Sequence, residues 1–135
     1  MMSKVCKRVI LHCDCNSFFA SVETALNPEY IGVPMAVCGS TEDRHGIVLA
    51  KNELAKQYGI KTAETVYSAK QKCPSLVIAS PHYDKYSEYS ARVNAIYAKY
   101  TDMVEPFGID ESWLDVTASQ KLFGTGEQIA EMIRC

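Results

Sequence analysis

Three carboxylic acids stand at the ends of predicted strands. Asp14 follows the apolar, β-rich residues 8–13, and Asp110 and Glu111 lie side by side at a bend between two later strands. Carboxylates gathered in a partly buried place repel one another, so they bind either protons or a cation. Oxygen ligands select a hard cation, which predicts magnesium. Two such ions about 4 Å apart serve an in-line phosphoryl displacement, in which one activates a hydroxyl and the other holds the leaving pyrophosphate.

Three other interpretations of these acids remain open from the residues alone. Asp14 is far from the other two acids in the chain, and all three fit solvated acids at loop ends. A phosphatase with Asp14 as nucleophile is the second interpretation, because an apolar strand ending in aspartate also opens haloacid-dehalogenase-like enzymes. Asn16 weakens it, since that chemistry uses an acid two residues after the nucleophile. The third is a truncated, non-catalytic interaction module.

Strands and helices alternate over the first part of the chain. Apolar β-rich runs predict strands at residues 8–13, 34–38, 47–50 and 76–79. Asn16 or Ser17 is expected to cap a helix that runs to residue 26. Two short helices are expected from residue 52 to Gly59 and over residues 66–72, with a polar loop at 40–45.

A longer helix and a strand pair fill the second part. Apolar and aromatic residues recur at spacings of three and four over residues 84–100: Tyr86, Tyr89, Val93, Ile96 and Tyr100. This stripe predicts a packed core face rather than a platform for stacking bases. Residues 103–107 and 112–116 read as strands around the acid bend. Residues 124–126 open a last helix with three core-facing residues, Ile129, Met132 and Ile133.

The composition predicts a small globular protein of the cytoplasm. The chain has 135 residues, 47% hydrophobic and 22% charged, which suits one domain or a piece of a larger one. No apolar run reaches the roughly 18 residues of a membrane span, and the first residues do not form a secretion signal. The net charge of −2 argues against a sequence-independent grip on DNA, which depends on lysine and arginine.

The six cysteines are expected to be free thiols, because a cytosolic protein keeps its thiols reduced. Buried cysteine as a small apolar filler is the favoured interpretation. A zinc site of His12, Cys13 and Cys15 is disfavoured, because no second ligand pair stands at a matching spacing.

Four segments in order resemble the opening of a Y-family (translesion, DNA polymerase IV or UmuC-like, ImpB/MucB/SamB) DNA polymerase. They are DCNSFFASVE at residues 14–23, GVPMAV at 32–37 after the NP pair at 27–28, AKQYGI at 55–60, and VEPFGIDESWLDVT at 104–117. The last segment resembles the second catalytic motif of the family. The likeness covers nearly the whole chain.

This resemblance implies an α+β fold, with a palm-type mixed or antiparallel sheet, helices on one face, and a small inserted fingers subdomain. Residues 1–26 and 82–135 would form an incomplete palm and 27–81 the fingers. The thumb and the basic little finger of the family would be absent. The fragment would then have weak or no polymerase activity of its own.

The resemblance also assigns roles by position. Asp14, Asp110 and Glu111 would hold two Mg²⁺ ions, with Mn²⁺ as a substitute and the main-chain carbonyl of Cys15 as a further ligand. Phe19 would be a steric gate whose ring clashes with a ribose 2′-hydroxyl.

Nucleotide binding would fall to the start of the first helix and to one basic side chain. The main-chain amides of residues 16–19, which are Asn16, Ser17, Phe18 and Phe19, would hold the triphosphate of a dNTP. Lys56 matches a family arginine and keeps its charge without the forked geometry. Glu53 matches a family tyrosine, and we expect this acid to turn away from the triphosphate. Primer-template DNA is the expected second substrate, a sliding clamp is a candidate partner through the missing region, and no membrane partner is expected.

Overall fold

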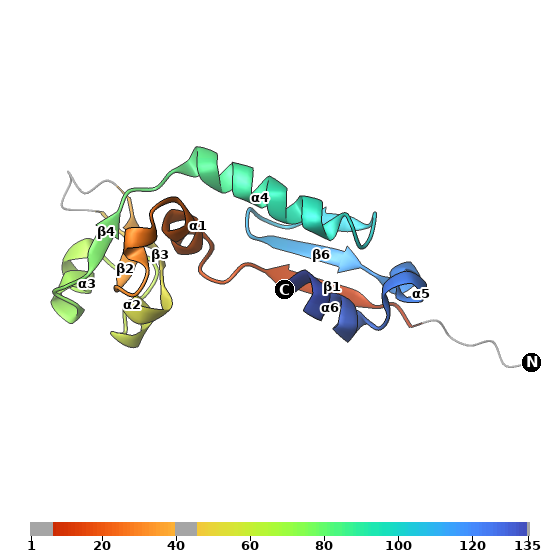
Figure 1. Cartoon of the computed structure of the whole chain (residues 1–135). Helices are drawn as coiled ribbons and strands as arrows, with labels where there is room; N and C mark the ends of the chain where they lie inside the picture. The colour runs from red at the N-terminus through yellow and green to blue at the C-terminus, as the bar shows by residue number, and fades with distance from the viewer. Residues whose placement is uncertain (1–6, 40–45, 135) are drawn as a thin grey trace, which may run out of the picture. The chain divides into compact units, whose positions relative to one another are not determined.

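The computed structural model describes residues 7–39 and 46–134. The chain forms two compact units, one made of Met1–Cys15 with Ser87–Cys135 and the other of Asn16–Tyr86. Both units combine strands with helices, so the predicted α+β class is confirmed. The boundary at residue 86 falls inside the longest described helix, α4 (Tyr83–Tyr97), which Figure 1 labels.

The first unit is built on a three-stranded antiparallel sheet in the order β1-β6-β5 (Figure 1). The strands are β1 (Ile10–Asp14), β5 (Val104–Pro106) and β6 (Glu111–Asp115). One face of the sheet packs against α4 and α6 (Gly126–Arg134) around a buried cluster of Tyr97, Leu114, Val116 and Ile129. The other face leaves Ile10 and Trp113 exposed, as the alternation along each strand requires. The acids of interest therefore lie at one end of a sheet with one covered and one open face.

The core-facing residues predicted for α4 and α6 agree with the structure in part. Tyr86 and Tyr97 of α4 are buried, but Ile96 is 41% exposed, so the prediction that Ile96 faces the core is wrong. Eleven residues make three helical turns, and Tyr97 is therefore the residue aligned with Tyr86. In α6, Ile129 is buried and Ile133 half-buried, whereas Met132 is exposed, against the prediction.

Two short helical segments between β6 and α6 were not predicted. They are the 3-10 helix η2 (Thr117–Ser119) and α5 (Gln120–Phe123). Both are too short for a helical periodicity to be read in the sequence.

The second unit has a mixed sheet in the order β3-β2-β4. Its central strand β2 (Met35–Cys38) pairs antiparallel with β3 (Val48–Lys51) and parallel with β4 (Val77–Ala79). The helices are α1 (Phe18–Leu26), the 3-10 helix η1 (Pro28–Tyr30), α2 (Glu53–Gln57) and α3 (Val66–Lys72). The bounds predicted for α3 are confirmed. The Asn52 side chain caps α2 by accepting from Ala55 N at 3.0 Å, and Gly59 ends it at a φ of +80°.

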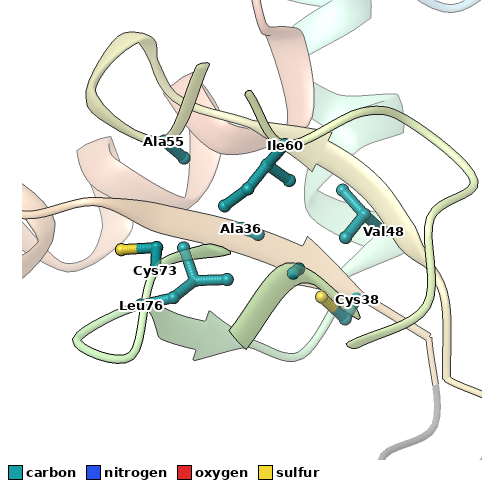
Figure 2. Packing of buried hydrophobic residues seen from close by; sticks show 8 residues of the cluster. Ala36, Cys38, Val48, Ala55, Ile60, Cys73 and Leu76 are labelled. Carbon is teal, nitrogen blue, oxygen red and sulfur yellow. The ribbon is translucent and has the colours of Figure 1, made fainter. Parts of the chain in front are cut away.

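All four residues of β2 are buried because both faces of this strand are covered. On one face Ala36 and Cys38 join a cluster with Val48, Ala55, Ile60, Ala69, Cys73 and Leu76, most of which Figure 2 labels. On the other face Met35 and Val37 pack with Ala20 of α1 and with Ala79. Helix α1 therefore packs on the sheet of the second unit. The predicted palm and fingers boundaries stay predictions.

The described cysteines are free thiols, as expected. Cys38 and Cys73 are buried fillers, while Cys13 and Cys15 are half-buried. Cys6, Cys135 and the predicted loop at 40–45 lie outside the described residues. Within the described part of the chain, no helix combines the length and apolarity needed to cross a membrane.

Candidate functional site

The pairing of β1 with β6 brings the early and late acids together. Asp14 lies directly opposite Glu111 in the antiparallel register, and the Cys15 N–H donates to the main-chain oxygen of Asp110 at 2.9 Å. Residues opposite each other in such a pair have Cα atoms about 5 Å apart. Segments about 100 residues apart in sequence thus place three carboxylic acids on adjoining backbone positions.

The acid bend is held by polar side chains of α4. The bend closes through the Phe107 N–H, which donates to the Glu111 oxygen at 2.9 Å. The Ser90 hydroxyl donates to the Ile109 oxygen on one side of the acids. On the other side the buried Ser112 hydroxyl donates to Asn94 Oδ1 at 2.6 Å. Both ends of the bend are therefore tied to one rigid helix.

Ser90 and Asn94 were missed in the sequence. Their signal is weak but present: two polar residues four apart stand on the otherwise apolar inner face of α4, beside Val93 and Tyr97.

The backbone positions of the acids adjoin, but their side chains are not collected around one point. Glu111 Oε1 lies 3.8 Å from His12 Nε2, and the His12 ring stacks on Trp113 with centroids 4.3 Å apart. Among residues 7–39 and 46–134, no three His, Cys, Asp or Glu side chains are arranged to hold a metal ion.

The side chains of His12, Cys13 and Cys15, the disfavoured zinc ligands, also do not lie together on one face of the sheet. His12 is on the open face of the sheet beside Trp113, whereas the thiol of Cys15 points to the covered face, 4.0 Å from Tyr97 Oη. Successive strand residues face opposite sides, so Cys13 also turns away from His12.

The thiol of Cys15 is held in its protonated form. Burial raises its pKa, the Tyr97 hydroxyl offsets part of that rise, and the nearby charges of Asp110 and Asp14 raise it further. A protonated thiol is a poor metal ligand, so the main-chain carbonyl is the part of Cys15 suited to a hard cation.

The start of α1 is strained. Ser17 adopts a left-handed conformation, with φ 48° and ψ 49°, which is uncommon for a residue other than glycine. Within the described residues its hydroxyl is buried and makes no hydrogen bond. The predicted side-chain cap by Asn16 or Ser17 is therefore wrong, since Asn16 instead donates to Glu53. Strain of this kind clusters at ligand sites.

Glu53 contacts two of the residues predicted to bind the nucleotide, and the expectation that it turns away from a triphosphate stays a prediction. Glu53 Oε1 accepts from Asn16 Nδ2 and from Lys56 Nζ, both at 3.0 Å. These contacts, the one from Asn16 first, lower the pKa of Glu53. The positive charge is that of Lys56, one turn along the helix, and its attraction holds the Glu53 carboxylate in this position.

Phe18 and Phe19 differ in burial and in how their rings contact Tyr86. Phe18 is buried and packs edge-on to Tyr86, with centroids 6.3 Å apart. Phe19 is only half-buried and stacks on the same tyrosine with centroids 4.1 Å apart and ring planes within 10°. Phe18 thus fills the core, while Phe19 keeps an accessible side, which a gate requires.

A family model that matches nearly the whole chain identifies the family. The model of the impB/mucB/samB family matches residues 13–135. The chain belongs to the impB/mucB/samB family. The Y-family resemblance of its sequence is thereby confirmed.

Relatives in this family are DNA polymerases by name. The chain is 58% identical over 128 residues to DNA polymerase IV of Acetivibrio thermocellus, covering 95% of this chain and 32% of that protein. It is 45% identical over 128 residues to DNA polymerase IV 2 of Bacillus subtilis, covering 95% and 31%. The chain thus spans about a third of the length of these curated relatives.

Solved structures of the family share the fold. An insertion ternary complex of Dbh DNA polymerase matches with a TM-score of 0.84 at 32% identity, over 92% of this chain and 37% of that one. DinB from Sulfolobus solfataricus matches with a TM-score of 0.79 at 33% identity, over 93% and 36%. These impB/mucB/samB relatives do not favour the phosphatase interpretation.

Proposed function

We propose that this chain is the amino-terminal catalytic part of a translesion DNA polymerase. Such a polymerase would act in DNA repair and in the response to DNA damage. The reaction would be template-directed nucleotidyl transfer from a dNTP to a primer 3′-hydroxyl. The observation that supports it most is the pairing of Asp14 with Glu111 beside Asp110. The names of the relatives support the same chemistry.

The donor set fits a pair of hard divalent cations. Asp14, Asp110, Glu111 and the Cys15 carbonyl offer oxygen only, which suits Mg²⁺ and also Mn²⁺. When bound, the two ions would lower the pKa of the attacking hydroxyl and neutralise the leaving pyrophosphate. The hydrogen bond that Ser90 donates to Ile109 and the one that Asn94 accepts from Ser112 would keep the acid bend in place.

The second unit would bind the nucleotide. The first amides of α1, from Asn16 to Phe19, have no acceptor inside the helix and face an anion favourably. Lys56 would add a positive charge, and Phe19 would exclude a ribose. The Glu53 carboxylate accepts hydrogen bonds from both Asn16 and Lys56. A triphosphate that binds these residues would therefore have to displace it.

The whole polymerase would need more than this chain offers. A net charge of −2 gives little attraction for a duplex, so the grip on primer-template DNA would come from other segments. We therefore propose weak or no polymerase activity for this chain alone, a cytoplasmic location, and a sliding clamp as a candidate partner of the whole protein.

Metal-dependent nucleotide binding tests the proposal. The probe is 2-aminopurine deoxyribonucleoside triphosphate, whose fluorescent base leaves the sugar free. We expect Mg²⁺ or Mn²⁺ to promote its binding and Asp14→Ala to abolish that effect. Asp102→Ala, the same change at an exposed position of the first unit, should leave binding intact.

Two results would count against it. If neither ion promotes binding and Asp14→Ala changes nothing, the catalytic assignment is wrong. A phosphatase would instead hydrolyse p-nitrophenyl phosphate without nucleic acid and lose that activity on Asp14→Asn.

A further inference from the structure

A carboxylate is buried directly beneath the predicted gate. Glu23 lies on α1 one turn after Phe19 and is only 2% exposed. A buried charge of this kind is costly unless it is paired and hydrogen-bonded. The metal and nucleotide sites proposed above do not use it, so its burial calls for another role.

Two side chains satisfy Glu23. Its Oε1 accepts from the Tyr86 hydroxyl at 2.7 Å, and its two oxygens lie 2.8 and 3.0 Å from His82 Nδ1. The Tyr86 hydroxyl is the donor in its bond, and His82 donates in the tautomer that carries a proton on Nδ1. Burial, and then the bond to Glu23, raise the pKa of Tyr86, which keeps its hydroxyl available as a donor.

Tyr86 in turn fixes the ring of Phe19. The two rings stack face to face at 4.1 Å, and Tyr83 meets the Phe19 ring edge-on at 6.1 Å. Tyr86 itself is fully buried, and the bond from its hydroxyl to Glu23 anchors the far end of its ring. The orientation of Phe19 therefore depends on Tyr86, and that of Tyr86 on Glu23.

We propose that Glu23 is a positioning residue for sugar selection: it holds the Tyr86 hydroxyl so that the tyrosine ring keeps Phe19 rigid against a ribose 2′-hydroxyl. This inference rests on the proposed function, because it takes Phe19 as the gate. A gate that works by a clash selects only as well as it resists being pushed aside. A rigid backing is therefore what separates a selective gate from an ordinary aromatic contact.

The test compares the deoxyribo and ribo forms of 2-aminopurine triphosphate, each titrated into the chain with Mn²⁺. The unaltered chain should bind the deoxyribo form more tightly. Glu23→Leu, which keeps the side-chain volume, and Tyr86→Phe, which keeps the ring, should each lower that preference by about tenfold, comparable with the loss of one hydrogen bond to a charged group. Deoxyribonucleotide affinity itself should change little.

A conservative variant and a control separate positioning from stability. Glu23→Gln keeps an oxygen that accepts from the Tyr86 hydroxyl, so the preference should return to near its original value. Glu29→Leu makes the Glu23→Leu change at an exposed residue six positions on and should have no effect. Thermal unfolding of each variant shows that it is folded.

The outcomes are distinct. A preference unchanged in Glu23→Leu and in Tyr86→Phe, with tight deoxyribonucleotide binding retained, overturns this inference and leaves the proposed function standing. Equal loss in Glu23→Gln and Glu23→Leu also overturns it, because the acceptor would then be irrelevant. An unaltered chain that binds neither nucleotide overturns the proposed function and the inference with it.

Discussion

Replacing Asn94 by leucine should loosen the acid bend without emptying the inner face of α4. Asn94 Oδ1 accepts the hydroxyl of Ser112 at 2.6 Å, and Ser112 is only 1% exposed. Without that acceptor the hydroxyl is buried and unsatisfied, which costs about 1 to 3 kcal/mol. Ser112→Ala removes the hydroxyl as well, so the double variant should recover about 1 kcal/mol of the summed losses.

Urea unfolding followed by tryptophan fluorescence measures this cost. Trp113 is the single tryptophan of the chain and directly follows Ser112 in β6, so its emission reports on the first unit. We expect Asn94→Leu to lower the free energy of unfolding of that unit by about 1 to 3 kcal/mol. The same variant should weaken Mn²⁺ binding by about tenfold, as for other residues that orient metal ligands.

Ala95→Leu is the matched control, because it introduces the same side chain at the exposed neighbouring position of α4. Strictly additive costs in the cycle of Asn94 and Ser112 would refute the idea that their bond holds the bend. Unchanged Mn²⁺ affinity in Asn94→Leu would refute the link between the bend and metal binding.

Three further outcomes follow from other contacts. Glu53→Gln should tighten Mn²⁺-dependent triphosphate binding several-fold in the 2-aminopurine titration, because Lys56 loses its competing carboxylate. Hydrogen bonds, the one from Lys72 first, lower the pKa of Glu64 from 4.5 to about 2, so its stabilisation is full above pH 4.5 and is lost as the pH falls toward 2. Glu64→Gln should therefore lower the melting temperature at pH 7 but not near pH 2. Burial raises the pKa of Cys38 to about 11, so tandem mass spectrometry should find the Cys38 thiol alkylated by iodoacetamide at pH 8 more slowly than the half-buried Cys15 thiol.

Features set by neighbouring residues were readable in the sequence. The start of a short helix at residue 52, its stop at Gly59 and the bounds of α3 depend on contacts within a few residues, and all agree with the structure. The place of Asp14, Asp110 and Glu111 at strand ends was also readable, because a two-residue alternation with a break marks a strand end.

Features set by distant contacts were not readable. Glu23 reads as a solvated acid on an amphipathic helix, since its partners lie 59 and 63 residues further along the chain. The contact of Glu53 with Asn16 joins residues that are 37 positions apart in the sequence. The left-handed conformation of Ser17 has no local signal, because serine rarely adopts it without support from the surrounding fold.

A crystal of the chain grown with Mn²⁺ and a dNTP gives the most direct test of the metal assignment. We predict two anomalous-scattering peaks about 4 Å apart, with carboxylate oxygens of Asp14, Asp110 and Glu111 within bonding distance. Peaks bound elsewhere, or Asp14 turned away from the ions that Asp110 and Glu111 bind, would contradict the account.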